Sequence, residues 1–365
     1  MKISIEVGHP AHVHYWRNAI DLLGSRGHRV EVLARQKEVA LQLLQAYAIP
    51  YEVVGRSRPT LLWKGIGLFL DDLRVLRVAR RKGIEFMLST GIPGSEHASR
   101  VLGVPHVALI DTEIAVLGRL LAEPFSDAVC TPQCFRGEVR SGRHIRINGY
   151  LELMYLRPNY FRPDASVLDQ VGLSPGERYA IVRFSSSDSS HDLGYARNAV
   201  GSDEDRCELV KGLSKSYRVF VVTETVLPQS LKSCRLNLPP ERFHDLLAFA
   251  DLYVGEGATT ASEAGVLGVP WIYLSKSRRG YLDDQEERYG TGRTVNSLKE
   301  VLPVVESLVA IPRSEWARRR ELLLETTVDV TRFVVDLVDG WPESRGQHDE
   351  QSMILRQDVR GGQPG

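Results

Sequence analysis

The stretch DLYVGEGATTASEAGVLGVP, which runs from Asp251 to Pro270, decides the fold class. It begins with a short apolar run, passes through small residues around Gly257, and continues as a helical pattern to Leu267. A Gly-x-Pro turn then leads into a second apolar run at Trp271 to Leu274. A strand, a helix and a strand in this order form a βαβ unit, whose strands are parallel.

The same alternation recurs on both sides of this stretch. Apolar runs at 3–7 and 29–34 flank a helical pattern at 15–25, and a second series begins at Tyr179. The sequence therefore predicts an α/β protein with two doubly wound domains, at 1–155 and 164–340. The Tyr- and Pro-rich segment 149–163 is the predicted linker, and the polar segment 342–365 is a predicted disordered tail.

Composition excludes several classes of function. Lys and Arg number 46, and so do Asp and Glu, so no global positive field favours nucleic acid. The four cysteines show no CxxC pair and no zinc spacing with histidine, so we expect neither a metal nor a disulfide framework. Because the sequence shows no export signal and no membrane-spanning run, we expect a cytoplasmic protein.

A candidate phosphate site lies in the quoted stretch, between its strand and its helix. Small residues there let a phosphate approach the backbone at a helix amino terminus. The candidate contacts are Gly255, Glu256, Gly257, Ala258, Thr259 and Thr260.

Glu263, about one helical turn further on, has two interpretations. It is placed to accept hydrogen bonds from a ribose diol, as acidic residues do in dinucleotide folds. It can equally complete a capping box with Thr259 or Thr260 as the N-cap. Local spacing does not choose between these interpretations.

Three histidines follow the first predicted strand, in GHPAHVH from Gly8 to His14. Loops at this end of an open α/β sheet bind ligands. His12 and His9 are candidate catalytic bases, because a near-neutral imidazole can take a proton from a hydroxyl group. The alternatives are local packing or capping, above all for His14, and a metal site, which no nearby Cys or carboxylate cluster supports.

Other polar groups also follow predicted strands. Asp111 and Glu113 come after the strand at 106–110 and are alternative candidates for the base, and segment 89–97 is expected beside them on the acceptor side. Arg183, Ser185 and Ser187 follow the strand that starts at Tyr179. These residues either bind phosphate oxygens or belong to a mobile polar loop.

Segment 61–82 mixes aromatic and aliphatic residues with six basic ones. This pattern is found in helices that lie on a membrane surface. It is equally typical of an amphipathic helix that packs on a sheet.

The quoted motif resembles the nucleotide-binding region of GT-B glycosyltransferases related to MurG, and that of the non-hydrolysing UDP-N-acetylglucosamine 2-epimerases. The strand, the Gly- and Thr-rich loop, Glu263 and the Gly268-Val269-Pro270 turn carry the resemblance. The His-rich segment 8–14, together with Gly280-Tyr281-Leu282-Asp283, is similar to a group of GT-B-like proteins of unknown function. The resemblance covers about residues 1 to 340.

The resemblance implies two Rossmann-like domains that face each other across a cleft, with the nucleotide in the second domain. It implies that Glu263 contacts the ribose and that 257–260 contact the diphosphate. It further implies contacts from the backbone of Phe243 and His244 to the base, and from Gln285 to the donor sugar.

In the first domain, the resemblance aligns His12 with the histidine that ends the family's first loop. That loop is normally Gly-rich, whereas His9 and Pro10 occupy it here. The resemblance therefore does not carry over how the first loop would contact the acceptor.

We therefore expect a metal-independent glycosyltransferase without a bound cofactor, acting on a nucleotide-diphosphate sugar and a sugar or lipid-linked acceptor. One alternative is a UDP-N-acetylglucosamine 2-epimerase. Another is a non-catalytic sugar-nucleotide-binding subunit. A dinucleotide dehydrogenase is disfavoured, because no Gly-x-Gly-x-x-Gly follows Val7.

Overall fold

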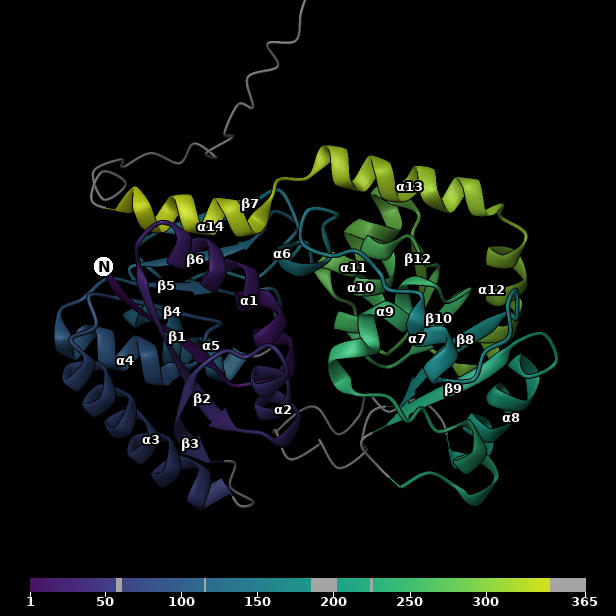
Figure 1. Ribbon diagram of the computed structural model, residues 1–365, viewed down its shortest axis with the longest axis horizontal. Coiled ribbons are helices and arrows are strands. Elements are labelled where there is room, and N and C mark those ends of the chain that lie inside the picture. Colours follow the sequence, from purple (N-terminus) through teal and green to yellow (C-terminus); the bar gives the residue numbers. More distant parts are fainter. Residues whose placement is uncertain (57–60, 115, 185–201, 224–225, 342–365) are drawn as a thin grey trace, which may run out of the picture.

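The computed structural model describes residues 1–56, 61–114, 116–184, 202–223 and 226–341. Two parallel β-sheets form two lobes that stand side by side, with helices around each sheet (Figure 1). This confirms the predicted α/β class with two Rossmann-like domains. The predicted tail 342–365 and the site residues Ser185 and Ser187 lie outside the described residues.

The first sheet has the strand order β3-β2-β1-β4-β5-β6-β7. Its strands are β1 (Lys2–Val7), β2 (Arg29–Gln36), β3 (Tyr51–Arg56), β4 (Phe86–Ser89), β5 (His106–Leu109), β6 (Ala128–Pro132) and β7 (His144–Ile147). The helices between them are α1 (Pro10–Ser25), α2 (Glu38–Ala46), α3 (Leu61–Lys82), α4 (Pro93–Leu102) and α5 (Val116–Ala122), with the 3-10 turn η1 (Glu123–Phe125). The central strands are buried on both faces, which explains their continuous apolar runs.

The second sheet has the order β12-β11-β10-β8-β9. Its strands are β8 (Tyr179–Phe184), β9 (Arg218–Thr223), β10 (Leu252–Gly255), β11 (Trp271–Leu274) and β12 (Gly292–Val295). The helices are α7 (Ser166–Gln170), α8 (Asp203–Leu213), α9 (Phe243–Ala248), α10 (Ala258–Leu267), α11 (Gly280–Asp284), α12 (Leu298–Val309) and α13 (Arg313–Thr326). Short turns are η3 (Gln229–Cys234), η4 (Pro240–Arg242) and the π-helical η5 (Gln285–Tyr289).

Helix α1 starts earlier than predicted, so residues 10–14 of the His-rich segment are helical. Pro10 occupies the first helical position, where its missing N–H costs nothing. His9 is the N-cap, and its Nδ1 accepts the Ala11 N–H at 3.2 Å. The sequence reasoning placed the helix start near Tyr15 because histidine is an uncommon cap.

The first half of the predicted linker, residues 150–156, is buried. It contains the short helix α6 (Leu153–Leu156), and every residue from Tyr150 to Leu156 is at most 2% exposed. Asn18 and Arg17 of α1 donate to the carbonyl groups of Met154 and Tyr155. The segment therefore belongs to the packed core at the domain boundary.

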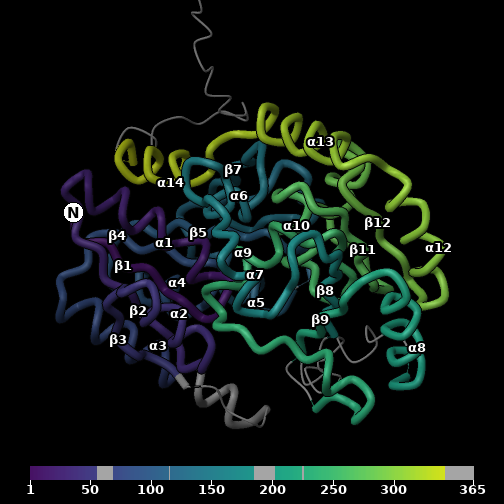
Figure 2. Tube along the Cα trace, turned by 45° about the vertical axis from the view of Figure 1, so that its right-hand side comes forward, coloured from purple at the N-terminus to yellow at the C-terminus, as the bar shows by residue number. Residues whose placement is uncertain are grey.

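The sequence pattern from Trp316 to Val338 predicts one helix, but the structure has two. After α13 the chain extends at Thr327, and Asp329 caps α14 (Val330–Asp339) by accepting the Arg332 N–H. Helix α13 covers the second lobe and α14 covers the first, a crossing that both views show (Figures 1 and 2). Helix α14 thus packs on α1 of the first domain, whereas the predicted boundaries placed it in the second.

Candidate functional site

The amino terminus of α10 is built around glycine and one arginine. The N-cap is Gly257, which has no capping side chain, and the first turn contains no acidic residue. The Arg183 guanidinium lies over this end and donates to Thr260 Oγ1 at 2.8 Å. A Cβ atom on Gly257 would come within 3.0 Å of Arg183 Cδ and of the Tyr253 hydroxyl. Helix amides and a guanidinium therefore converge on one point, which is the arrangement that binds anions.

The capping-box interpretation of Glu263 is wrong, because α10 starts before either threonine can act as its N-cap. Oε1 of Glu263 instead accepts from the Tyr155 hydroxyl at 2.6 Å and lies 2.9 Å from His244 Nε2. Burial alone would raise the pKa of Glu263, but His244, Tyr155 and Arg183 lower it overall. Glu263 is thus an ionised carboxylate, 5% exposed, close to the anion-binding end of α10.

The side chains of three other predicted nucleotide-site residues contact groups of the protein itself. Glu256 faces Arg206, whose Nη2 lies 3.4 Å from Oε1. The side chain of His244 is turned to Glu263, next to Phe243. Gln285 is completely buried and donates to Ser262 Oγ at 2.7 Å, so it supports α10 from within the domain. A direct contact from Gln285 to a donor sugar therefore does not fit this arrangement.

The histidines of the first domain have three different environments. His14 is buried at the domain boundary, and its ring centre lies 4.6 Å from that of His244. His9 caps α1, and part of the residue is exposed to solvent. Desolvation by the surrounding protein, together with the charges of Lys37 and Arg183, lowers the pKa of His9 to about 4. The local capping and packing considered for His9 and His14 are therefore present in the structure.

His12 faces the end of β4. Gly8 N–H lies 3.2 Å from Nδ1, and the Thr90 hydroxyl lies 2.7 Å from the same atom. Because a backbone N–H can only donate, Nδ1 accepts and the neutral ring carries its proton on Nε2. Burial and the nearby charges of His9 and Lys37 lower the pKa of His12 well below its usual value. This arrangement presents an N–H donor and does not favour His12 as a base.

Asp111 is the better-placed proton acceptor. It follows β5, is partly exposed, and accepts from the Tyr15 hydroxyl at 3.1 Å. Burial, opposed by the Tyr15 hydrogen bond, raises the pKa of Asp111 above its usual value. Glu113, two residues on, accepts the Arg136 N–H at 3.1 Å and lies against Gly280 of the second domain. Asp111 is therefore a candidate proton acceptor at this end of β5.

Sequence reasoning missed the residues that join the two domains at this site. Tyr155, Tyr15 and Glu152 are all buried at the boundary, and none belongs to a recognisable motif. Arg136 and Asp283 form a further link, with 2.6 Å between Nη1 and Oδ2. Only the tyrosine-rich character of segment 149–163 could have suggested a polar interface there.

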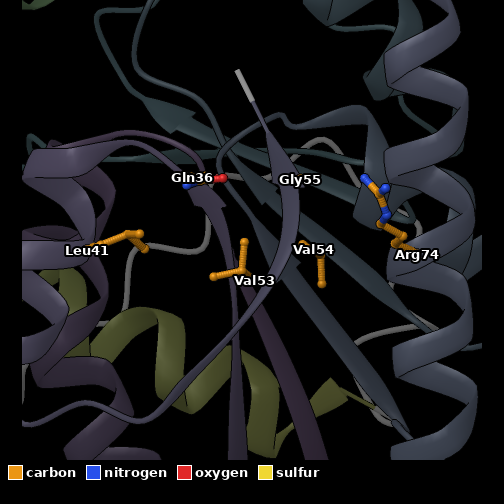
Figure 3. A pocket seen from close by; sticks show the side chains of 6 residues that line it. All are labelled: Gln36, Leu41, Val53, Val54, Gly55 and Arg74. Carbon is orange, nitrogen blue, oxygen red and sulfur yellow. The ribbon is translucent and has the colours of Figure 1, made fainter. Parts of the chain in front are cut away.

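Two cavities of the structure lie away from this boundary. The larger has a volume of about 360 Å³ and lies at the outer edge of the first sheet (Figure 3). It is lined by Gln36, Leu41, Val53, Val54, Gly55 and Arg74. The smaller, of about 160 Å³, lies near Phe125 on the first domain. The described residues contain no group of His, Cys, Asp or Glu side chains arranged to hold a metal.

The second half of α3 packs on the first sheet. Val75 and Ala79 are fully buried, and Arg81 forms an ion pair with Glu52 at 2.6 Å. Phe69 is 64% exposed. In the described part of the chain, no helix has both the length and the hydropathy needed to cross a membrane.

Comparison with known proteins gives a result at the level of structure only. No protein-family model and no curated protein sequence matches the chain. The UDP-GlcNAc 2-epimerase of Neisseria meningitidis, solved with UDP-GlcNAc bound, superposes with a TM-score of 0.65 at 12% identity, over 93% of this chain and 99% of that one. The enzyme of Methanocaldococcus jannaschii, in complex with UDP-GlcNAc and UDP, gives 0.63 at 13% identity, over 93% and 100%.

A sugar transferase has the same fold. The spinosyn forosaminyltransferase SpnP superposes with a TM-score of 0.60 at 14% identity, over 95% of this chain and 100% of that one. The chain therefore has the GT-B fold, which these epimerases and transferases share. At these identities the likeness establishes the architecture, and the chemistry has to be argued from the site.

Proposed function

We propose that the protein is an enzyme that binds a nucleotide-diphosphate sugar at the amino terminus of α10 and transfers the sugar to an acceptor hydroxyl. The observation that carries the proposal is the convergence of Arg183, the first turn of α10 and the carboxylate of Glu263. A diphosphate fits the cationic part of this arrangement, and a ribose diol fits the carboxylate. The structural neighbours solved with UDP or UDP-GlcNAc support this assignment.

In this reaction Asp111 is the base. It takes the proton of the acceptor hydroxyl, whose oxygen forms a bond to the anomeric carbon while the bond from that carbon to the diphosphate breaks. Arg183 and the α10 amides stabilise the negative charge that builds up on the departing diphosphate, so this step needs no metal ion. The Nε2–H of His12 is a further hydrogen-bond donor on the first-domain side.

A 2-epimerase is the second candidate function. Asp111 and Glu113 place two carboxylates on one loop opposite the proposed nucleotide site, and epimerisation needs groups that remove and return a proton. Two of the structural neighbours described above are UDP-GlcNAc 2-epimerases.

The test is product analysis with a panel of nucleotide sugars, with and without a mixture of acceptor sugars. Release of nucleotide diphosphate that requires an acceptor, and that is lost in Asp111→Asn, supports transfer. An epimer, or deuterium from D₂O in the sugar, formed without acceptor would instead establish epimerisation. Tight nucleotide binding with neither product would contradict both and indicate a binding subunit.

A further inference from the structure

Glu152 lies at the boundary between the domains, just before α6. Its side chain is 1% exposed, and Oε1 is buried without a hydrogen-bond partner in the described chain. Asp111 of the first domain and Glu263 of the second both act on it electrostatically. An ionised carboxylate at such a position would be strongly disfavoured.

The three carboxyl groups of this cluster differ in their partners. Asp111 accepts from Tyr15 and feels the charge of Arg279. Glu263 accepts from Tyr155 and His244 and feels the charge of Arg183. None of the groups that act most strongly on Glu152 is a cation. The groups that face it are Asp111, Glu263, Ser262, Tyr15, Tyr155, Tyr281 and Cys134.

A chain of buried hydrogen bonds inside the second domain ends at Ser262, which acts on Glu152. Trp271 Nε1 donates to Thr291 Oγ1 at 3.1 Å, and that hydroxyl lies 3.4 Å from Gln285 Oε1. Gln285 Nε2 donates to Ser262 Oγ at 2.7 Å, and the Ser262 side chain acts on Glu152 in the direction that lowers its pKa. No cation is among the groups that act most strongly on Glu152, so a negative charge there would lack compensation.

We propose that Glu152 is a positioning residue that carries the proton of this three-carboxyl cluster at neutral pH and thereby leaves Asp111 and Glu263 ionised. The role given to Asp111 and Glu263 rests on the proposed function. Burial, reinforced by the charge of Asp111, raises the pKa of Glu152 to about 8. Loss of this proton would add a third negative charge beside the site that has to accept a diphosphate.

Glu96 supplies a matched control. It is also fully buried, its Oε2 has no partner in the described chain, and burial raises the pKa of Glu96 well above its usual value. It lies inside the first domain, where Ser89 donates to it at 2.7 Å. Glu96→Gln therefore removes a buried acid of the same kind without touching the domain boundary.

The first test needs no ligand. In protein labelled with ¹³C at the glutamate carboxyl carbon, a resonance that titrates near pH 8 is expected to persist in Glu96→Gln and to disappear in Glu152→Gln. If the resonance lost in Glu152→Gln titrates near pH 4, the proposal is overturned. If Glu152→Gln does not fold, spectra of wild type and Glu96→Gln still decide, because a glutamate titrating near pH 8 must be present in both.

The second test measures the positioning role through the affinity for UDP between pH 7 and 9.5. Above pH 8, the affinity of the wild-type and Glu96→Gln proteins for UDP is expected to fall, and the fall should approach tenfold for each pH unit. The affinity of Glu152→Gln for UDP should stay the same from pH 7 to 9.5. Parallel profiles of all three proteins would overturn the positioning role. If no protein binds UDP at any pH, the proposed function fails, while the carboxyl titration still decides where the proton resides.

Discussion

The hydroxyl of Tyr155 donates to Oε1 of Glu263 over 2.6 Å, and this bond joins the segment between the domains to the helix of the nucleotide site. His244 approaches the same oxygen, and His14 of the first domain packs edge-on against His244. The carboxylate proposed to bind ribose is therefore oriented by residues from three parts of the chain. A ligand that engages Glu263 is coupled to the contact between the domains.

Removal of this bond should weaken nucleotide binding. Tyr155→Phe deletes the hydroxyl and leaves Glu263 with one fewer donor, which should cost about 1.5–3 kcal/mol of folding stability, as for other hydrogen bonds to charged groups. We expect the Kd for UDP, measured by calorimetry, to rise about tenfold as Glu263 loses its fixed orientation.

Tyr179→Phe is the matched control for this prediction. The Tyr179 hydroxyl donates to the Leu246 carbonyl at 2.6 Å, and it too is buried. This variant should lose stability but keep its affinity for UDP. An equal loss of affinity in both variants would show that Tyr155 acts only through general stability.

UDP binding should require glycine at position 257, because this position has no room for a side chain. A Cβ atom there would press on Arg183 Cδ and on the Tyr253 hydroxyl, each at 3.0 Å, so Gly257→Ala should displace the guanidinium from the end of α10. We expect UDP binding to fall at least tenfold in an equilibrium titration. Gly24→Ala, in α1 with no atom within 4 Å of the new methyl group, should leave binding unchanged and stabilise the protein by up to about 1 kcal/mol. Unaltered UDP affinity in Gly257→Ala would contradict the placement of the diphosphate.

Arg183 should contribute to the diphosphate and not to the nucleoside. Arg183→Ala is expected to weaken UDP by about 1.5–3 kcal/mol, the range for charge-assisted hydrogen bonds, and to leave uridine binding unchanged. Arg293→Ala, which removes a largely exposed arginine that faces Glu286 at 3.3 Å, should change neither. Equal losses for UDP and uridine in Arg183→Ala would place Arg183 outside the phosphate contacts.

A buried histidine should make the protein sensitive to acid. Burial lowers the pKa of His106 from 6.5 to about 3, so between these values the unfolded chain binds a proton that the folded chain does not. Stability must therefore fall as the pH drops from 6.5 towards 3, with a slope of about 1.4 kcal/mol per pH unit for this residue. Urea unfolding from pH 6.5 to 4.5 should show a shallower slope in His106→Asn than in wild type. Identical slopes would mean that His106 is protonated in the folded protein.

The sequence was sufficient to predict the two-domain architecture, because the central strands are buried on both faces and read as continuous apolar runs. It did not predict β7 or β12. Both are edge strands of four residues, HIRI and GRTV, whose polar positions leave no continuous apolar signal. The division between α13 and α14 was also missed, since the extended residue Thr327 and the N-cap Asp329 interrupt an otherwise continuous helical pattern only briefly.

The phosphate contacts could be proposed from the sequence because the residues concerned are neighbours along the chain, from Gly255 to Glu263. The partners of Glu263 were not, because Tyr155 lies 108 positions away and no spacing rule connects the two. The roles of the histidines were equally hidden. The proton position on His12 depends on Gly8 N–H and Thr90, which only the folded chain brings together.

The central claim is that the end of α10 binds a nucleotide diphosphate, and thermal unfolding with a panel of nucleotides and nucleotide sugars tests it most directly. A ligand at 100 times its Kd should stabilise the wild-type protein by about 2.7 kcal/mol. Glu263→Ala should lose most of this effect. Glu123→Ala, which removes a buried carboxylate paired with Arg119 in the first domain, should retain it. If no nucleotide or nucleotide sugar stabilises the wild-type protein at millimolar concentration, the account is contradicted.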